Sequence, residues 1–402
     1  MSKVWLISEY YYPVVVTTGY YVTEIAEYYA RKGVDINVIS SNNKYYESDE
    51  TATLKEEEHN GVKIFRSIRR QIAKDKNSAR IVRLLSLSFS FLWMALRRIK
   101  KGDEVIILTN PAFFMLMMPV VRFFTGCMYH ILVHDIFPEN LVSIGKVQQG
   151  GMAYKVLKGI YNRAYAKADS CIAIGHDMKK VLESKVNGKT KVGLITNWSD
   201  VDEVKPMPKE GTNTFKKISK FAMGSVVFQF AGNLGKAQGL DNLMAAIDKV
   251  TASDAKFLFV GAGAKLEDVN AFAESHSNTL SLGFVSRSEQ NDFLNACDIG
   301  VVTLADGMYG LGVPSKSYNI MATGRPILYI GELDSEIAIC IEKYKIGWVV
   351  RPNDPVGLAQ MVENILHEKD LIPEMGKRAR EVAENVFGKN VVLEQYYQYI
   401  GK

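Results

Sequence analysis

The sequence predicts an α/β protein with two doubly wound parallel-sheet domains in tandem. In both halves of the 402-residue chain, short apolar runs alternate with stretches of helical periodicity, the pattern of a parallel sheet covered by helices. A polar stretch with two prolines at residues 199–220 separates the halves, and we interpret it as an interdomain linker with a lead-in segment. The length allows each domain its own core.

Each half supplies the strands of one sheet. The first begins with "KVWLIS" at residues 3–8, a helical stretch that Gly33 ends, and "DINVIS" at residues 35–40. Further strands are predicted at residues 104–109, 130–135, 170–175 and 191–196, and in the second half at 225–232, 256–263, 280–285, 298–304, 326–331 and 347–350. Ligands of such sheets bind outside the carboxyl ends of the strands, so we expect a cleft that both sheets face.

The bulk composition is that of an ordinary globular protein. A formal net charge of +5 gives no reason to expect a nucleic-acid partner. The four cysteines are widely scattered and are interpreted as reduced core residues. No cluster of metal-ligating residues stands out, so we expect neither a metal nor a cofactor. The first apolar run is too short for a signal peptide and meets Glu9 early, which predicts a cytoplasmic chain.

One segment is strongly basic. Residues 61–101 hold twelve Lys or Arg against one acid, and from Arg80 to Lys101 six cations flank thirteen uncharged residues, fewer than the roughly 20 that cross a bilayer. Two interpretations stay open. The segment is either a helix on an anionic membrane surface at the inner face of the plasma membrane, or a core helix with solvated basic ends. The aromatic side chains that the first interpretation places in the interface are Phe89, Phe91 and Trp93.

Two glycine-rich loops predict an anion site in the second domain. "AGNLGKAQGL" follows a strand and carries Lys236, and "YGLGVPSKSYNIMATGRP" at residues 309–326 carries Lys316 and not one carboxylate. Glycines free backbone N–H groups, and a following helix adds the positive end of its dipole, so each loop suits a phosphate. One such loop alone is more often structural, whereas two in the same domain favour binding.

The strand at residues 130–135 ends in residues that can do chemistry. "ILVHDIFPENL" places His134, Asp135 and Glu139 at or just beyond the carboxyl end of this strand. A histidine there can hold a sugar hydroxyl or relay a proton, but a lone histidine is as often a structural residue. Both interpretations stay open.

Five ordered motifs resemble the retaining glycosyltransferases of family 4, which have the GT-B fold of two Rossmann-like domains facing a central cleft. They are "EYYYPVVVTTG", "HDIFPENLVSIG", "ITNWSD", "FAGNLGKAQGLDNL" and "GVPSKSYNIMATGRPILYIG". The similarity is to the bacterial branch that builds O-antigen and capsule, including acetamido-fucose and hexosamine transferases. It implies an acceptor-binding domain at residues 1–203, joined by a C-terminal helix at about residues 386–402 that crosses back, and a donor-binding domain at residues 204–385.

The resemblance also implies roles for particular residues. His134 matches the catalytic histidine close to the transferred sugar, and Asp135, Glu139 and Asp306 are secondary or acceptor-side candidates. Val285 lies where the family reads the base, an arrangement that suits uracil, with guanine as the alternative. The positions implied for donor binding are Thr18, Gly19, Gly232, Asn233, Lys236, Gln238, Val285, Gly312, Val313, Lys316 and Asn319.

The sequence departs from the family pattern at four of its charged positions. The family's phosphate-binding Arg and Lys fall on Asn233 and Gln238, and its two glutamates fall on Leu311 and Asn319. We expect Lys236 and Lys316 to replace the missing cations. Asp306 is the candidate replacement for the first glutamate.

The resemblance predicts a retaining, metal-independent enzyme that moves a sugar from a nucleotide sugar, expected to be UDP-activated, to a lipid-linked or surface-polysaccharide acceptor. The lost glutamates keep a sugar-nucleotide-binding scaffold with little turnover as an alternative. A nucleotide-sugar 2-epimerase of the same fold is a further alternative, although the matched loops lack its extra acid and base residues. A dehydrogenase is disfavoured because the dinucleotide fingerprint is absent.

Overall fold

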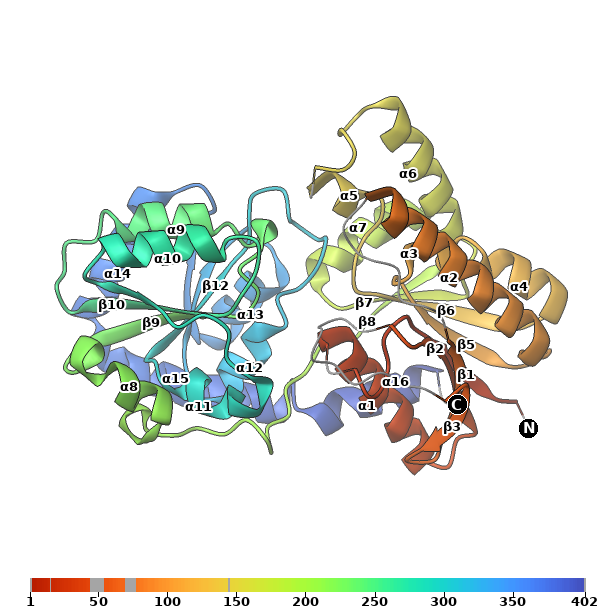
Figure 1. Ribbon diagram of the computed structural model, residues 1–402, viewed down its shortest axis with the longest axis horizontal. Coiled ribbons are helices and arrows are strands. Elements are labelled where there is room, and N and C mark those ends of the chain that lie inside the picture. The colour runs from red at the N-terminus through yellow and green to blue at the C-terminus, as the bar shows by residue number, and fades with distance from the viewer. Residues whose placement is uncertain (1, 15, 44–53, 69–76, 144, 401–402) are drawn as a thin grey trace. The chain divides into compact units, whose positions relative to one another are not determined.

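The computed structural model describes the chain except residues 1, 15, 44–53, 69–76, 144 and 401–402. It divides into two compact units, each labelled by element in Figure 1. Unit 1 comprises Met1–Thr196, Gly310–Gly312 and Leu393–Lys402, and unit 2 comprises Asn197–Tyr309 and Val313–Val392.

Unit 1 is built on an eight-stranded sheet in the order β3-β4-β2-β1-β5-β6-β7-β8. Its strands are parallel, except that β3 and β4 form an antiparallel hairpin. The apolar runs of β1, β2 and β5 are almost wholly buried because helices cover both faces. The strands are β1 (Val4–Ile7), β2 (Ile36–Ser41), β3 (Glu56–His59), β4 (Val62–Ser67), β5 (Glu104–Leu108), β6 (Met128–Val133), β7 (Ser170–Ala173) and β8 (Lys191–Leu194).

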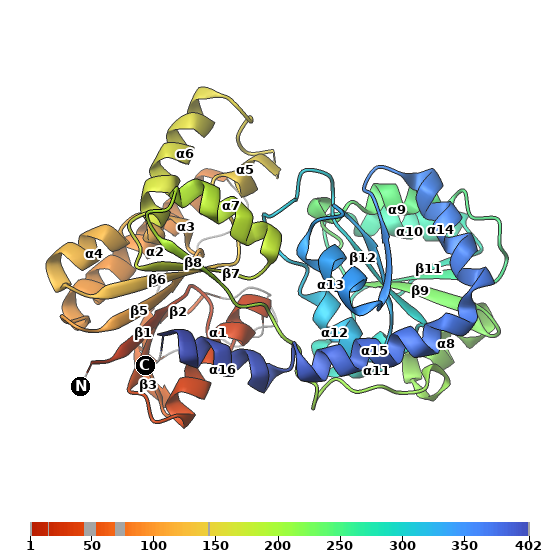
Figure 2. The same cartoon turned by 180° about the vertical axis from the view of Figure 1, so that it is seen from behind.

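The helices of unit 1 include one from the end of the chain. The tyrosine hydroxyl of Tyr29 in α1 donates to the main-chain oxygen of Tyr396 in α16 at 2.7 Å, so these two helices lie side by side, as Figure 2 shows from behind. The helices are α1 (Thr17–Arg31), α2 (Asn77–Arg98), α3 (Ala112–Met115), α4 (Met118–Thr125), α5 (Glu139–Ser143), α6 (Met152–Tyr165), α7 (His176–Val186) and α16 (Lys389–Ile400), of which the part from Leu393 onward belongs to this unit.

Unit 2 is built on a six-stranded, all-parallel sheet in the order β11-β10-β9-β12-β13-β14. The strands are β9 (Val226–Ala231), β10 (Ala255–Val260), β11 (Thr279–Ser281), β12 (Ile299–Thr303), β13 (Ile327–Ile330) and β14 (Gly347–Val350). The helices are α8 (Asn213–Ala222), α9 (Leu240–Ile247), α10 (Leu266–Ser275), α11 (Gln290–Asn295), α12 (Lys316–Ala322), α13 (Glu336–Tyr344), α14 (Pro355–His367) and α15 (Ile372–Asn385). Apolar side chains of α9, α10 and α14 form the core on one face, and those of α8, α11, α12, α13 and α15 form the core on the other.

The compact units begin and end a few residues away from the domain bounds expected from the sequence. Unit 1 ends at Thr196, and Val201 packs against the core of unit 2. The C-terminal return begins at Leu393 rather than near residue 386, because residues before it still belong to unit 2.

The stretch expected to be a linker is partly a helix. Within residues 199–220, α8 begins after Thr212, whose hydroxyl accepts a hydrogen bond from the Phe215 amide at 3.0 Å and caps the helix. Phe215 and Ile218 are buried. An N-cap threonine with two apolar residues three apart is a helix signal that the sequence analysis missed.

The basic segment contains a long helix with two unlike faces. Leu87, Phe91 and Ala95 in α2 are buried, so Phe91 is a core residue, and the interpretation that put it in a membrane interface is wrong for this side chain. Phe89 and Trp93 face the other way and are 59% and 58% exposed. No helix among the described residues is both long and apolar enough to cross a membrane.

Candidate functional site

The donor-side residues predicted in unit 2 lie where its strands end. The loop after β9 is tied to two neighbouring loops: the Leu234 amide donates to the Ala262 oxygen at 2.9 Å, and the Ala305 amide donates to the Ala237 oxygen at 2.9 Å. Gly239 has a φ of 63°, and a Cβ on it would come within 3.1 Å of the main chain at Ala305. A glycine is therefore needed at this turn. The main-chain hydrogen bonds between these loops hold the carboxyl edge of the sheet together, and the lack of a side chain at Gly239 allows the loops to approach this closely.

Lys316 is the charged centre of this edge. It opens α12, and its Nζ lies 3.2 Å from Oε1 of Gln238 and 3.6 Å from the ring centroid of Phe230. A Cβ on Gly232, whose φ is 135°, would lie 3.3 Å from the same Nζ. Lys316 is half-buried, and burial lowers its pKa from the usual 10.5 to about 7. Burial is the sole cause of that shift, and among the described residues no carboxylate supports the ammonium form.

Of the other predicted donor-side residues, one contacts Lys316 and the rest lie in the same loop, in α12 or on the surface. Gln238, which stands where the family has a lysine, accepts the hydrogen bond from Lys316. Asn233 and Lys236 are exposed in the same loop, and Asn319 is half-buried in the first turn of α12. Asp306 is exposed and accepts a hydrogen bond from Asn353 at 3.2 Å. Asp306 is therefore hydrogen-bonded to another side chain at the protein surface.

Val285 and Val313 lie in different loops of unit 2, and both pack partly buried against its core. Gly312 instead belongs to unit 1. Leu311, at a position of a family glutamate, is buried there, and its oxygen accepts from the Ile136 amide at 3.4 Å. An aliphatic side chain in this position cannot hydrogen-bond a sugar.

His134 follows β6 in unit 1 and is kept neutral by its surroundings. Its Nε2 is buried and has no hydrogen-bond partner among the described residues. Burial lowers its pKa to about 4. The ring of Tyr21 meets the imidazole edge-on at a centroid distance of 6.3 Å, and the main-chain oxygen of His134 lies 3.6 Å from where a Cβ on Gly312 would be. A neutral imidazole with one unpaired nitrogen can still form a hydrogen bond to a ligand.

Asp135 and Glu139, in contrast, have partners of their own. Oδ1 of Asp135 accepts from the side-chain Nδ2 of Asn140 at 2.7 Å, and burial raises the pKa of this carboxyl. Both oxygens of Glu139 accept from Nζ of Lys185, at 2.7 and 2.6 Å. Glu139 is therefore turned toward α7.

Thr18 and Gly19 lie in the first turn of α1. Thr18 is half-buried, whereas Gly19 is buried, and a Cβ on it would lie 2.5 Å from the main-chain oxygen of Val14. Close packing against the loop before α1 therefore requires this glycine, whatever else binds there.

Sequence reasoning missed a buried carboxylate in unit 1. Glu9 follows β1, is 1% exposed, and its Oε1 accepts from Asn43 Nδ2 at 2.9 Å and from Arg83 Nη1 at 2.8 Å. An acid directly after an apolar strand was the available signal. Its partners come from β2's end and from α2, which sequence spacing alone does not bring together.

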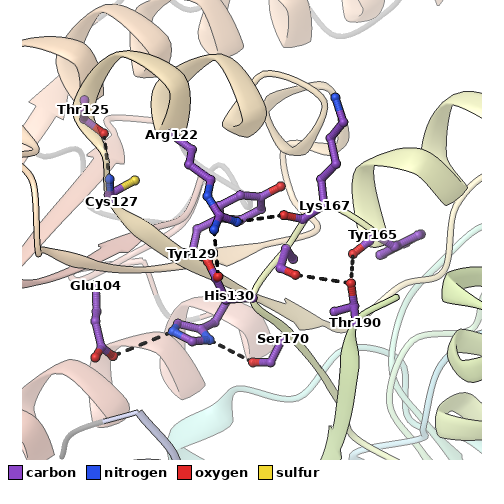
Figure 3. A network of polar contacts seen from close by, with 12 residues as sticks. Glu104, Arg122, Thr125, Cys127, Tyr129, His130, Tyr165, Lys167, Ser170 and Thr190 are labelled. Carbon is purple, nitrogen blue, oxygen red and sulfur yellow. Dashed lines mark hydrogen bonds and ion pairs between the residues drawn. The ribbon is translucent and has the colours of Figure 1, made fainter. Parts of the chain in front are cut away.

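Figure 3 shows a second polar network of unit 1, toward the amino ends of its strands. His130 Nδ1 lies 2.8 Å from Ser170 Oγ, and its Nε2 lies 3.7 Å from Glu104. Burial lowers the pKa of His130 and raises that of Glu104. Because ligands of parallel sheets bind at the opposite, carboxyl end, we interpret this network as structural.

Comparisons with known proteins identify the family. Residues 18–203 match the family described as Glycosyltransferase Family 4, and residues 225–368 match Glycosyl transferases group 1. The chain is 38% identical over 311 residues to "Probable glycosyltransferase WbjE" of Pseudomonas aeruginosa, covering 77% of each. The chain belongs to the group 1 glycosyltransferases. This glycosyltransferase is also 22% identical, over 96% of each chain, to "Putative colanic acid biosynthesis glycosyl transferase WcaI" of Escherichia coli K12.

Solved structures place the enzyme in the GT-B fold. Sucrose-phosphate synthase of Thermosynechococcus elongatus matches with a TM-score of 0.77 at 15% identity, over 99% of this chain and 98% of that one. Anabaena HepE in complex with UDP matches with a TM-score of 0.71 at 13% identity, over all of both chains. WaaG, a glycosyltransferase of lipopolysaccharide biosynthesis, matches with a TM-score of 0.69 at 13% identity, over 99% of both. The GT-B fold expected from the sequence is confirmed.

The buried amine predicts a pH-dependent change in stability. Between about pH 7 and 10 the unfolded chain binds more protons at Lys316 than the folded chain does, so this residue destabilises the fold most at low pH. Lys316→Met should therefore be more stable than the parent below pH 7, by about 1 kcal/mol, and the difference should fade toward pH 10. Urea unfolding at several pH values measures this.

Lys236→Met is the matched control for this measurement, because Lys236 is exposed in the same unit. It should change the free energy of unfolding by less than about 0.5 kcal/mol at every pH. A Lys316→Met protein less stable than the parent near pH 6.5 would contradict the prediction.

Proposed function

We propose that this glycosyltransferase moves a sugar from a UDP-activated donor, bound by unit 2, to a lipid-linked or surface-polysaccharide acceptor, bound by unit 1, with retention of configuration and without a metal. The observation that carries the proposal is Lys316, a half-buried amine at the carboxyl edge of the sheet that has no carboxylate partner among the described residues. A diphosphate would supply the missing negative charge. The names of WcaI and WaaG, and the UDP bound to HepE, support this direction.

On the donor side, Lys316 contacts the diphosphate in this proposal, helped by the main-chain amides of the Gly232 loop. Gln238 holds the amine in place, and Lys236 approaches from the exposed side of the loop. Asn319 hydrogen-bonds ribose hydroxyls, and the chain near Val285 reads the uracil edge. Asn233, Gly312, Val313, Thr18 and Gly19 are proposed as further donor contacts.

The chemistry follows from where charge develops. When the sugar leaves, negative charge collects on the nucleoside diphosphate, and preorganised amides with one lysine stabilise it. The described residues contain no group of three His, Cys, Asp or Glu that could hold a metal ion, and in this proposal Lys316 supplies the positive charge. The acceptor hydroxyl attacks from the face on which the diphosphate leaves: its oxygen bonds the sugar carbon as the bond to the diphosphate breaks, and its proton passes to the departing phosphate oxygen. This keeps the configuration without a covalent intermediate.

His134 positions the transferred sugar in this mechanism rather than accepting its proton. A histidine whose pKa is lowered to about 4 is neutral at physiological pH and a weak base. Its buried, unpartnered Nε2 can instead bond a sugar hydroxyl. Asp135 and Asp306 remain secondary candidates on the acceptor and donor sides.

The first experiment is thermal stabilisation of the protein by nucleotides. UDP at a hundred times its dissociation constant should add about 2.7 kcal/mol to the free energy of unfolding. GDP at the same concentration should add less, because we expect it to bind more weakly. Lys316→Met should weaken UDP binding at least about tenfold, because a charge-assisted hydrogen bond contributes about 1.5 to 3 kcal/mol. Lys249→Met, an exposed lysine at the end of α9 outside this loop, is the control. Stabilisation by UDP that survives Lys316→Met would contradict the assigned role.

The second candidate function is a sugar-nucleotide-binding scaffold with little turnover. Leu311 and Asn319 favour it, because they stand where the family has glutamates and neither can carry charge. Slow hydrolysis of a UDP-sugar by the purified protein would argue against this candidate. UDP binding without any hydrolysis or transfer would favour it.

The role of His134 predicts a kinetic signature. His134→Ala should lower kcat about 10²-fold through lost positioning while changing the dissociation constant of UDP little. The pH profile of the parent should have no step near pH 6.5 that disappears in His134→Ala, because burial keeps this imidazole neutral down to about pH 4. If kcat of the parent rises with pH through a pKa near 6.5, and this dependence disappears in His134→Ala, His134 acts as a base.

We also propose that unit 1 rests on an anionic membrane surface. The exposed face of α2 carries Phe89 and Trp93, and the Arg97 guanidinium lies over the Trp93 ring at 4.2 Å. The neighbouring α4 exposes Phe123 and Phe124 by 83% and 70%. Aromatic side chains among cations are typical of a helix lying at a lipid headgroup layer.

Vesicle co-sedimentation tests this surface. Binding should need phosphatidylglycerol and should fall at least about tenfold when Phe89 and Trp93 are both changed to Ser, since apolar burial and charge act together. Changing Arg97, Lys100 and Lys101 to Gln should have a similar effect, whereas Lys249→Gln should have none. Arg98 is left unchanged because it already pairs with Glu56 at 2.7 Å. Equal binding to neutral vesicles would leave α2 as a core helix only.

A further inference from the structure

A cavity of about 430 Å³ lies within unit 1. It is formed by α6 and α7 with Glu139 at the start of α5, three helices that gather at one end of unit 1 in both Figure 1 and Figure 2. Its volume is that of sites for small molecules. None of the donor-side residues lines it.

The lining of this cavity is positively charged. Three of its seven lining residues are lysines, Lys158, Lys180 and Lys185. The one acid, Glu139, is already neutralised, because Lys185 Nζ bonds both of its oxygens and the Tyr154 hydroxyl donates to one of them at 3.2 Å. Lys158 and Lys180 have no carboxylate partner among the described residues, and Lys158 lies over the Tyr154 ring at 5.7 Å from its centroid. Such a pair attracts an anion.

The pKa of Lys185 also indicates an excess of positive charge in this cavity. Burial is the main cause that lowers its pKa, Glu139 opposes the shift, and the positive charge of Lys158 adds to it. Lys158 therefore lies close enough for the two cations to repel each other. A bound anion would relieve that repulsion.

A second feature of the cavity calls for a hydroxyl group. The side-chain oxygen of Asn162 is buried and has no hydrogen-bond partner among the described residues. A buried acceptor without a donor is costly, and a ligand hydroxyl would satisfy it. Ser184 adds a further polar group to the lining, and Val181 an apolar one.

From these two features together we propose that the cavity binds a phosphorylated saccharide, with the phosphate on Lys158 and Lys180 and a sugar hydroxyl on Asn162. The inference rests on the proposed function, since the ligand would be the phosphate-bearing part of the acceptor. It assigns Glu139 to the wall of an acceptor site, where it holds Lys185, and not to the chemistry.

Isothermal titration of the full-length protein with glucose 1-phosphate tests the site, with saturating UDP present to block donor binding. Lys158→Ala and Lys180→Ala should each weaken binding about tenfold, the loss expected for one charge-assisted contact. Lys155→Ala, on the same helix and exposed but outside the lining, should bind like the parent. Asn162→Ala should weaken the binding of glucose 1-phosphate but leave the binding of inorganic phosphate unchanged.

A methyl diester of glucose phosphate separates two sources of the ligand. Binding equal to that of glucose 1-phosphate indicates a lipid-linked saccharide, and preference for the monoester indicates a free sugar phosphate. No binding of either probe, or equal binding by the Lys158→Ala/Lys180→Ala protein, would overturn the site. Stabilisation by UDP is measured without these probes, so failure of the cavity and failure of the proposed donor site are distinguished.

Discussion

The buried amine of Lys316 is the feature on which the proposed donor site of this glycosyltransferase depends. Folding places it against an aromatic ring and one amide oxygen, and burial weakens its charge. In the absence of an anion this arrangement costs stability. A diphosphate would restore the charged form, so part of the binding energy would come from relieving a cost that folding has already imposed.

The rest of unit 2 keeps this lysine from relaxing. The loops after β9, β10 and β12 are hydrogen-bonded to one another through the main chain, so they cannot move apart independently. Gly232 and Gly239 adopt left-handed conformations that remove side chains from the same edge. Preorganisation of this kind is what an enzyme needs where charge develops, because a flexible site would spend binding energy on its own rearrangement.

Most strands and the two-unit organisation follow from alternating apolar runs, which local sequence records well, whereas the order of the strands in each sheet is specified only by the folded chain. The hairpin β3–β4 was missed although Asn60 and Gly61 form its turn with φ values of 47° and 77°, an Asn-Gly signal of a tight hairpin. The acidic run of β3 concealed it. Partnerships such as Lys316 with Gln238, or Glu9 with Arg83, join residues 78 and 74 positions apart. Only the folded chain specifies these.

Two lysines of this protein differ in whether a carboxylate pairs with their ammonium group. Lys185 is buried and has a carboxylate on its ammonium group, so its charge is used within the fold. Lys316 has an amide and a ring, neither of which can neutralise it. The same comparison applies to the acids: Glu139 spends both oxygens on Lys185, which leaves it unsuited to accept a proton from an acceptor hydroxyl. Lys316, Lys158 and Lys180 have no carboxylate partner among the described residues, which is why the two proposed binding sites are built on these charges.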